Sequence, residues 1–187
     1  MEEILKMLPH DETKRMIFRQ WIEQYGEKLL ERMPEGHFTA SGFIFNPEKT
    51  KTLMVFHNIY QSWAWTGGHA DGKRDLLAVA LREAREETGV QHIRPIDGTV
   101  CAADILPVAA HSKSGRPIAA HVHLNVTFAL ECEEADALRV KPDENSAVGW
   151  IPLAELPEKI SPSDAMMIPI YEKIIRKYAP EFYRGPK

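Results

Sequence analysis

The chain has 187 residues, of which 44% are hydrophobic and 27% are charged, and its formal net charge is −4 at pH 7. These values are typical of one folded domain with a substantial core. They argue against nucleic acid as the main partner, because phosphate backbones are bound by clustered Lys and Arg. The sequence contains no apolar run of membrane-spanning length and no signal-peptide pattern, so we expect a cytoplasmic protein without a membrane partner. Cys101 and Cys132 lack metal-type spacing, and we expect two buried free thiols.

The N-terminal segment predicts an amphipathic helix over residues 11–34. Asp11 is a suitable N-cap, and apolar residues recur at helical intervals from Phe18 to Met33. Gly26 weakens the middle of this helix and is a position where it can break. We treat residues 1–36 as an N-terminal helical extension that packs on the domain that follows. A cover over the active site and a contact in a homodimer are the alternatives.

Three strands are predicted next, at residues 37–46, 52–57 and 62–65, and the first two form a hairpin. In the third strand Trp63 and Trp65 alternate with a small residue, so both can face one side of a sheet. Packing in the core is the simpler role for this pair. Stacking on a base is the alternative, which makes Trp63 a candidate substrate-binding residue.

A glycine-rich loop then leads into a predicted helix that begins after Asp75 and ends before Gly89. The Asp75 carboxylate can accept a hydrogen bond from an amide of the first turn. Glycine can adopt the left-handed conformation that ends a helix. Helical spacing predicts one buried face, which consists of Leu77, Leu81, Ala84 and Thr88.

Three glutamates share a different face of this helix, because Glu83, Glu86 and Glu87 are spaced i, i+3 and i+4. Like charges at these spacings destabilise a helix by roughly a few tenths of a kcal/mol per pair. A divalent cation would reverse this repulsion, and Mg²⁺ prefers oxygen ligands. The pattern therefore predicts a metal site, with a solvated acidic face as the alternative.

Loop and helix together resemble the signature of the Nudix hydrolases: a glycine, a spaced glutamate, then Arg-Glu-apolar-x-Glu-Glu-x-Gly-apolar. Gly68 fills the first position, and the second half runs at the family's spacing from Arg82 to Val90. The strand that leads to Gly67 and Gly68 is also similar to the family, with Thr66 where proline is common. The resemblance implies an α/β fold, namely a Nudix-type α/β/α sandwich with a mixed β-sheet, for residues 37–187.

One position departs from the family pattern, because Arg74 stands where the isolated glutamate is expected. In the family that glutamate can pair with the arginine eight residues later, which is Arg82 here. Two guanidinium groups at these positions would repel each other. We therefore expect Asp71 or Asp75 to pair with Arg82, and Arg74 to turn outward as a substrate-binding residue near phosphate.

The resemblance also implies an activity: hydrolysis of the pyrophosphate linkage in a nucleoside diphosphate linked to another group, with Mg²⁺ or Mn²⁺. By this analogy Glu86 and Glu87 bind metal, and Glu83 binds metal or acts as the catalytic base. Arg82 orients the carboxylates. Gly67 and Gly68 let the backbone approach the helix closely, and they count among the substrate-binding candidates.

Downstream, strands are predicted at residues 99–110 and 120–132. The second has the cleanest alternation in the chain and places His121 and His123 on one side. These histidines can line a substrate groove or contact phosphate, and His123 is the substrate-binding candidate; a solvent-facing pair is the alternative. A histidine metal cluster is less favoured, because the glutamates already supply a metal site.

The C-terminal part contains Glu144 before a strand with Trp150, which resembles the closing strand of Nudix proteins. Glu144 is a further candidate ligand or catalytic base. A last amphipathic helix is predicted to begin at Ser163 or Asp164.

Two other functions stay open. The first is a non-catalytic Nudix-like module that binds a nucleotide as a sensor; the intact glutamates argue against it and Arg74 argues for it. The second is an isomerase acting on an isoprenoid diphosphate, which no feature of this sequence favours. The predicted partner is a small nucleotide-type molecule, and the sequence does not identify its leaving group.

Overall fold

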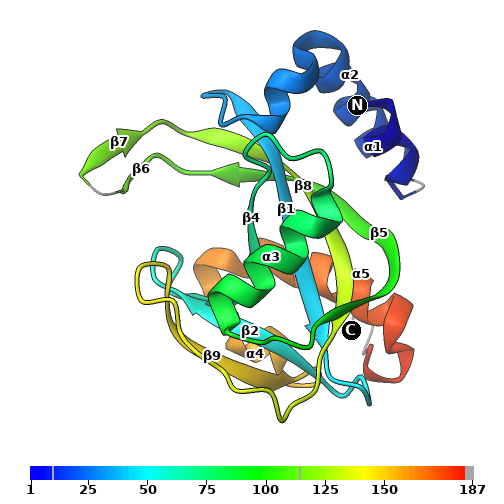
Figure 1. Cartoon of the computed structure of the whole chain (residues 1–187), viewed down its shortest axis with the longest axis vertical. Helices are drawn as coiled ribbons and strands as arrows, with labels where there is room; N and C mark the ends of the chain where they lie inside the picture. The colour runs from blue at the N-terminus through cyan, green and yellow to red at the C-terminus, as the bar shows by residue number, and fades with distance from the viewer. Residues whose placement is uncertain (10, 114, 184–187) are drawn as a thin grey trace.

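The structure is a computed structural model that describes residues 1–9, 11–113 and 115–183. Within these residues a mixed seven-stranded sheet forms the centre of the molecule (Figure 1). Its strands are β1 (Gly36–Phe45), β2 (Lys51–His57), β3 (Ser62–Ala64), β4 (Thr66–His69), β5 (Arg94–Val108), β8 (His121–Glu131) and β9 (Asn145–Pro152). A separate small hairpin consists of β6 (His111–Lys113) and β7 (Arg116–Ile118).

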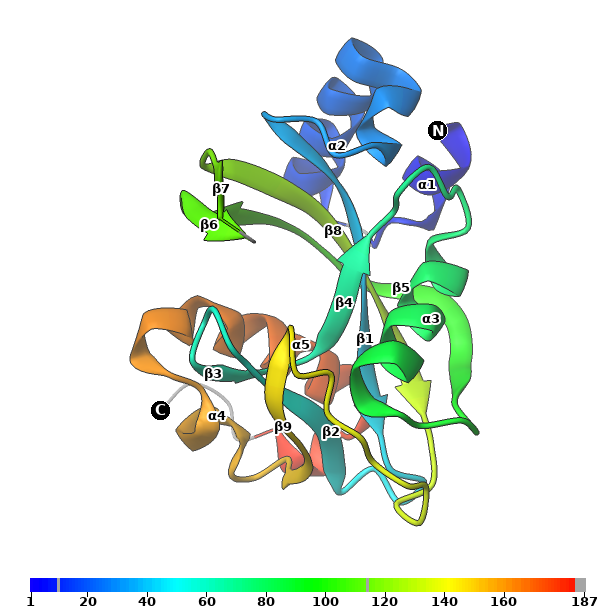
Figure 2. The same ribbon diagram turned by 60° about the vertical axis from the view of Figure 1, so that its left-hand side comes forward.

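Helices cover both faces of this sheet (Figure 2). The α-helices are α1 (Glu2–Met7), α2 (Glu12–Tyr25), α3 (Leu76–Thr88), α4 (Leu156–Lys159) and α5 (Ile168–Tyr178), with 3-10 helices at Gly26–Leu30, Pro162–Met167 and Pro180–Phe182. The predicted α/β/α sandwich with a mixed sheet is confirmed. None of the helices in the described ranges is both long enough and apolar enough to cross a membrane.

The alternation of side chains along β1 separates two hydrophobic cores. Phe38, Ala40 and Ile44 belong to the core that also contains residues of α1, α2 and α3. Phe43 and Phe45 belong to the second core, which contains residues of α4 and α5. Successive residues of a strand point to opposite faces, so this one strand joins both layers of helices to the sheet.

Strand β1 also positions the glycine-rich strand β4. It pairs with β8 in parallel along its whole length, with β4 from Thr39 to Gly42, and with β2 at Ile44 and Phe45. The predicted hairpin between the first two strands is therefore confirmed. Because β4 pairs with the central strand, its glycines are fixed beside α3, which packs against both strands.

Both predicted ends of α3 are confirmed, and its predicted buried face is half right, because Ala84 and Thr88 are fully buried. Asp75 accepts a hydrogen bond from the Ala78 amide at 2.9 Å, and Gly89 ends the helix in the left-handed conformation. Leu77 and Leu81 are only half-buried. The buried face is rotated and consists of Leu76, Val79, Ala80, Glu83, Ala84, Glu87 and Thr88. Two of the three glutamates therefore face inward.

The N-terminal segment is less regular than predicted. Asp11 caps α2 through the Lys14 amide, as expected, but α2 ends at Tyr25, where Gly26 has φ +56° and a 3-10 helix follows. Helix α1 was not predicted. The segment packs on the domain, because its apolar residues share one core with α3 and the sheet. A domain boundary at residue 36 stays a prediction.

Truncating this shared core should destabilise the whole protein. Phe18 of α2 is fully buried and packs against Phe38 of β1, with ring centroids 6.0 Å apart. We expect Phe18→Ala to lower the free energy of unfolding by about 3–5 kcal/mol. Met16→Ala is the matched control, because Met16 is 56% exposed in the same helix. Urea unfolding of both variants measures the difference, and equal midpoints would show that α2 is not part of the cooperative core.

The C-terminal half largely follows the sequence. The strands predicted at 99–110 and 120–132 correspond to β5 and β8, although β5 begins earlier. The loop between them carries the β6–β7 hairpin. The last α-helix begins at Ile168 instead of Ser163 or Asp164, because the chain first forms a 3-10 helix. Cys101 and Cys132 are buried free thiols, as predicted. Residues 184–187 of the predicted domain lie outside the described residues.

Candidate active site

Glu83 and Glu87 lie between α3 and the glycines of β4. Only 8% of Glu83 and 5% of Glu87 is exposed. The Gly67 amide donates a hydrogen bond to Oε1 of Glu87 at 3.1 Å. A Cβ added at Gly68 would overlap the carboxylate of Glu83 and would lie 2.8 Å from its Cγ. Gly68 therefore leaves the space that the carboxylate of Glu83 occupies, while the Gly67 amide holds the carboxylate of Glu87 beside the strand.

The burial of these carboxylates changes their acidity. Desolvation raises the pKa of Glu83, and the neighbouring positive charge of Arg82 opposes this shift. Desolvation raises the pKa of Glu87 well above its ordinary value, against the hydrogen bond from Gly67. The negative charge of Glu144 also raises the pKa of both carboxyl groups. A buried group of carboxylates is costly unless cations accompany it.

Arg82 is the cation that contacts Glu83. Its Nη2 atom lies 2.7 Å from Glu83 Oε1 and 3.3 Å from the carbonyl oxygen of His69. The guanidinium thus links Glu83 to the end of β4. Glu83 is the first of the three glutamates Glu83, Glu86 and Glu87 of α3, which we call the glutamate box. This contact fits the predicted role of Arg82, which is to orient the carboxylates.

The expected pairing of Arg82 with a loop aspartate is wrong. Asp71 instead forms two hydrogen bonds with Arg32 of the N-terminal segment, at 2.7 and 2.8 Å. Asp75 serves as the N-cap of α3. In the described part of the chain neither aspartate forms an ion pair with Arg82. The next residue, Glu83, supplies the carboxylate instead. The loop is held by the N-terminal extension instead, which no local pattern indicated.

Arg74 is exposed and forms an ion pair with Glu27 of the N-terminal extension. Its outward orientation is therefore confirmed, while its contact with substrate stays a prediction. Two contacts, Arg74 with Glu27 and Asp71 with Arg32, tie the extension to the loop before α3. The N-terminal extension thus contacts Arg74, the residue at the position of the family glutamate.

Removing the Arg74 side chain should have little effect on stability. Exposed ion pairs contribute about 0–1 kcal/mol, so Arg74→Ala should leave the thermal melt nearly unchanged. If Arg74 contacts substrate phosphate, the apparent KM should rise several-fold while kcat is retained. Arg19→Ala, at an exposed position of α2, is the control for loss of one positive charge. An unchanged KM for Arg74→Ala would remove this residue from the substrate site.

Glu86 and Glu144 lie at the exposed side of the same group. The side chain of Glu86 is 46% exposed. Lys141 connects them, because its Nζ lies 2.9 Å from Glu144 Oε2 and 3.7 Å from Glu86 Oε2. Glu144, which comes just before β9, is therefore brought to the box glutamates as expected. Lys141 was missed, since it stands in an acidic, irregular segment without periodicity.

The donor set fits a divalent cation. Four carboxylates gather here, those of Glu83, Glu86, Glu87 and Glu144. Arg82 contacts Glu83, and Lys141 contacts Glu86 and Glu144. Carboxylate oxygens are the ligands that Mg²⁺ and Mn²⁺ prefer. Net negative charge in a partly buried place favours a cation. The group can therefore hold the divalent metal that Nudix proteins generally use.

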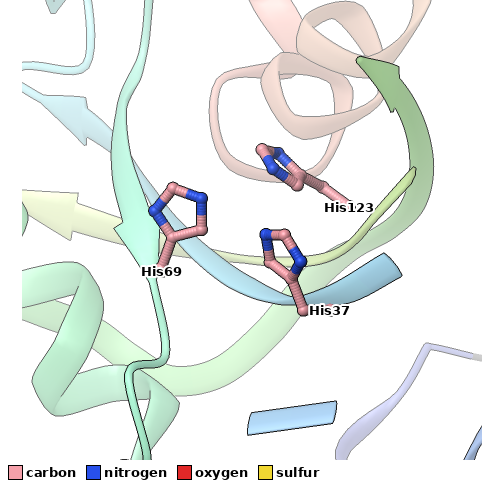
Figure 3. Close-up of side chains that lie close together, drawn as sticks. All are labelled: His37, His69 and His123. Carbon is pink, nitrogen blue, oxygen red and sulfur yellow. The ribbon is translucent and has the colours of Figure 1, made fainter. Parts of the chain in front are cut away.

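The remaining two candidates lie elsewhere. Trp63 is half-buried and packs edge-on against Phe56, with ring centroids 5.7 Å apart, and against Gly149. This contact supports a packing role, and stacking on substrate stays untested. His123 does not lie among solvent-facing groups: its ring is grouped with those of His37 and His69 (Figure 3). The sequence patterns did not indicate that His37 and His69 would join His123.

A cavity of about 290 Å³ opens between the β5–β6 connection and the 3-10 helix at Pro162–Met167. Tyr60 and Ile59, which line it, are largely exposed aromatic and aliphatic side chains. The residues that line this cavity include none of the box glutamates. The cavity therefore does not mark the site of chemistry.

Comparison with known proteins agrees with the geometry. A family model described as the NUDIX domain matches residues 36–171. The C. elegans Ap4A hydrolase binary complex is similar in fold, with a TM-score of 0.54 at 16% identity over 77% of this chain and 96% of that one. The NUDIX domain of Shewanella oneidensis NrtR, complexed with ADP ribose, gives 0.53 at 18% identity over 85% and 97%.

The E. coli dihydroneopterin triphosphate pyrophosphohydrolase also has this fold, with a TM-score of 0.53 at 13% identity over 81% of this chain and 98% of that one. No curated protein sequence matches the chain. Identities this low establish the fold alone, whereas the family model spans most of the sequence and includes the whole glutamate box. The chain therefore belongs to the NUDIX family.

Proposed function

We propose that this protein hydrolyses the pyrophosphate linkage of a nucleoside diphosphate linked to another group, and that the reaction depends on Mg²⁺ or Mn²⁺. One observation carries the proposal: Glu83 and Glu87 are buried against the glycines of β4, where desolvation disfavours their negative charge. A purely structural helix gains nothing from two buried carboxylates on one face. A cation at this place would compensate for the burial.

The proposed roles follow from the contacts. Glu83, Glu86 and Glu87 would hold the cation, and Arg82 keeps the carboxylate of Glu83 in one orientation. Glu144, held by Lys141, would be a further ligand or the base that accepts the proton of the attacking water. When bound, the cation supplies charge neutralisation for the phosphates and lowers the pKa of a coordinated water.

The backbone of β4 contributes to the same site. The Gly67 amide fixes one carboxylate oxygen of Glu87, so the other oxygen can serve as a ligand. Gly68 provides the space that Glu83 occupies. In this proposal both glycines act on the metal ligands, and direct contact of either glycine with substrate is not required for their effect.

A substrate panel tests the proposal. The compounds named for proteins of this fold, namely ADP ribose, Ap4A and dihydroneopterin triphosphate, join nucleoside triphosphates and ADP-sugars, each with Mg²⁺ and with Mn²⁺. We expect metal-dependent release of phosphate, pyrophosphate or a nucleoside monophosphate from at least one compound, and none in excess EDTA. Binding of a nucleotide without turnover would favour a sensor, and conversion of isopentenyl diphosphate without hydrolysis would favour an isomerase.

A further inference from the structure

Four histidine rings gather where β1, β4 and β8 meet. His37 of β1 lies opposite His123 in the parallel pairing with β8, and His69 ends β4 opposite Thr39. One ring nitrogen from each of His37, His69 and His123 lies within 4.8 Å of the others. His121 completes the group, because its ring centroid is 5.0 Å from that of His37. Figure 3 shows the three rings of His37, His69 and His123 turned toward one another.

Hydrogen bonds to backbone carbonyl oxygens orient two of these rings. His37 Nδ1 lies 2.9 Å from the carbonyl oxygen of Met33, and His121 Nδ1 lies 2.9 Å from that of Ala119. A carbonyl oxygen only accepts, so Nδ1 carries the proton in both rings. In a neutral ring Nε2 is then an electron-pair donor. This arrangement, with Nδ1 hydrogen-bonded to a carbonyl oxygen and the lone pair on Nε2, is typical of metal-binding histidines.

The Nε2 atom of His37 is the clearest indication of a ligand. Only 5% of His37 is exposed, and within the described residues its Nε2 is buried without a hydrogen-bond partner. Buried polar atoms are almost always paired, and an unpaired one has a cost in stability. Here the unpaired atom belongs to a ring that is in contact with three other imidazoles.

The surroundings also favour uncharged rings. Burial, together with the neighbouring histidines, lowers the pKa of His123 to about 3. Burial lowers the pKa of His37 as well. Neutral imidazole is the form that binds a metal ion.

We propose that His37, His69 and His123 form a binding site for a transition-metal ion such as Zn²⁺, distinct from the carboxylate site of α3. Imidazole nitrogens suit Zn²⁺, whereas Mg²⁺ prefers oxygen. Tetrahedral Zn²⁺ with its usual bond lengths needs ligand nitrogens roughly 3.3 Å apart, so small side-chain rotations bring the three rings into place. His121 is the nearest fourth nitrogen, because its Nε2 lies 3.2 Å from Nε2 of His123.

The two sites lie on opposite faces of one strand. Gly68 faces Glu83, and successive residues of a strand point to opposite sides, so His69 faces the histidine cluster. A Zn²⁺ ion at the histidines would therefore be held by a different set of elements from the cation at the glutamates. The proposal does not depend on which substrate the protein hydrolyses.

Zinc binding to the full-length chain, without a polyhistidine tag, tests this proposal. Titration calorimetry with Zn²⁺ alone should detect a site that His69→Ala and His123→Ala each weaken at least about tenfold, since even supporting residues of such sites contribute that much. His92→Ala is the matched control, because the His92 side chain is 82% exposed and pairs with Asp136. Glu87→Gln should leave this binding unchanged.

Several results would overturn the proposal. They are the absence of Zn²⁺ binding at micromolar metal, wild-type affinity in both histidine variants, and loss of the site in Glu87→Gln, which would place zinc at the carboxylates. His37 is not chosen for substitution because it is buried. X-ray absorption of the wild-type zinc complex is independent of how the variants fold: outer-shell scattering from several imidazoles is expected, and a purely oxygen environment would contradict the site.

Discussion

Glu87→Gln should reduce metal-dependent turnover by roughly a hundredfold or more. A bound metal stabilises the charge of the transition state and so lowers the activation barrier by roughly several kcal/mol. The substitution retains the size of the side chain, and the amide oxygen can still accept the hydrogen bond from Gly67. Only the negative charge is lost. Since burial already disfavours that charge, the free variant should be at least as stable as the wild type.

Steady-state kinetics at saturating Mg²⁺, together with thermal melts, measure both effects. Glu158→Gln is the control, because Glu158 is an exposed glutamate of α4 outside the box. A fall in kcat with an unchanged or raised melting temperature is expected for Glu87→Gln. Near-native turnover in this variant would mean that the buried carboxylate is structural and that the proposed metal ligands are wrong.

Gly68→Ala should also abolish most of the activity, for a steric reason. The added methyl group would occupy the space of the Glu83 carboxylate, which Arg82 holds in place. The carboxylate must move, and a displaced ligand weakens the metal site. Overpacking of this kind costs about 1–3 kcal/mol, so a lower melting temperature should accompany at least a tenfold loss of kcat.

The matched control for this substitution is Gly149→Ala. Gly149 is also a strand residue, and an added Cβ there would meet Trp63 at an ordinary contact distance of 3.6 Å. Kinetics and melts of the two alanine variants should therefore differ clearly. If Gly68→Ala retained wild-type kcat, the close approach of β4 to Glu83 would have no part in catalysis.

Features determined by neighbouring residues could be predicted from the sequence. The caps Asp75 and Gly89 set the ends of α3, and alternation identified β8. The buried face of α3 could not be predicted in the same way, because Leu77 and Leu81 offered an equally regular apolar pattern. The buried face keeps Ala84 and Thr88 but also includes Glu83 and Glu87, which lie against β4, and this tertiary contact is not visible in the helix itself.

Contacts between distant segments account for the other errors. Arg82 pairs with Glu83, while Asp71 is occupied by Arg32 from the N-terminal extension, 39 residues away in sequence. The sequence of the loop does not indicate this arrangement, because Arg32 lies outside the loop. It requires knowledge of where the extension packs.

The histidine cluster had one local signal, the alternation that puts His121 and His123 on the same side of β8. His37 joins them only through the parallel register of β1 and β8, in which it lies opposite His123. The two residues are far apart in sequence, so their proximity depends on strand order. A histidine metal cluster is less favoured from the sequence because the glutamates already supply a metal site, and the alternation along β8 indicates neither His37 nor His69.

Titration with Mn²⁺, followed by electron paramagnetic resonance, tests most directly whether the carboxylates of α3 hold the divalent cation. Mn²⁺ accepts the same oxygen ligands as Mg²⁺, and its free and bound forms can be distinguished. We predict that the wild type and His123→Ala bind Mn²⁺ alike and that the double variant Glu83→Gln/Glu87→Gln binds it at least about tenfold more weakly. Equal binding by the wild type and the double variant would contradict the proposed metal site.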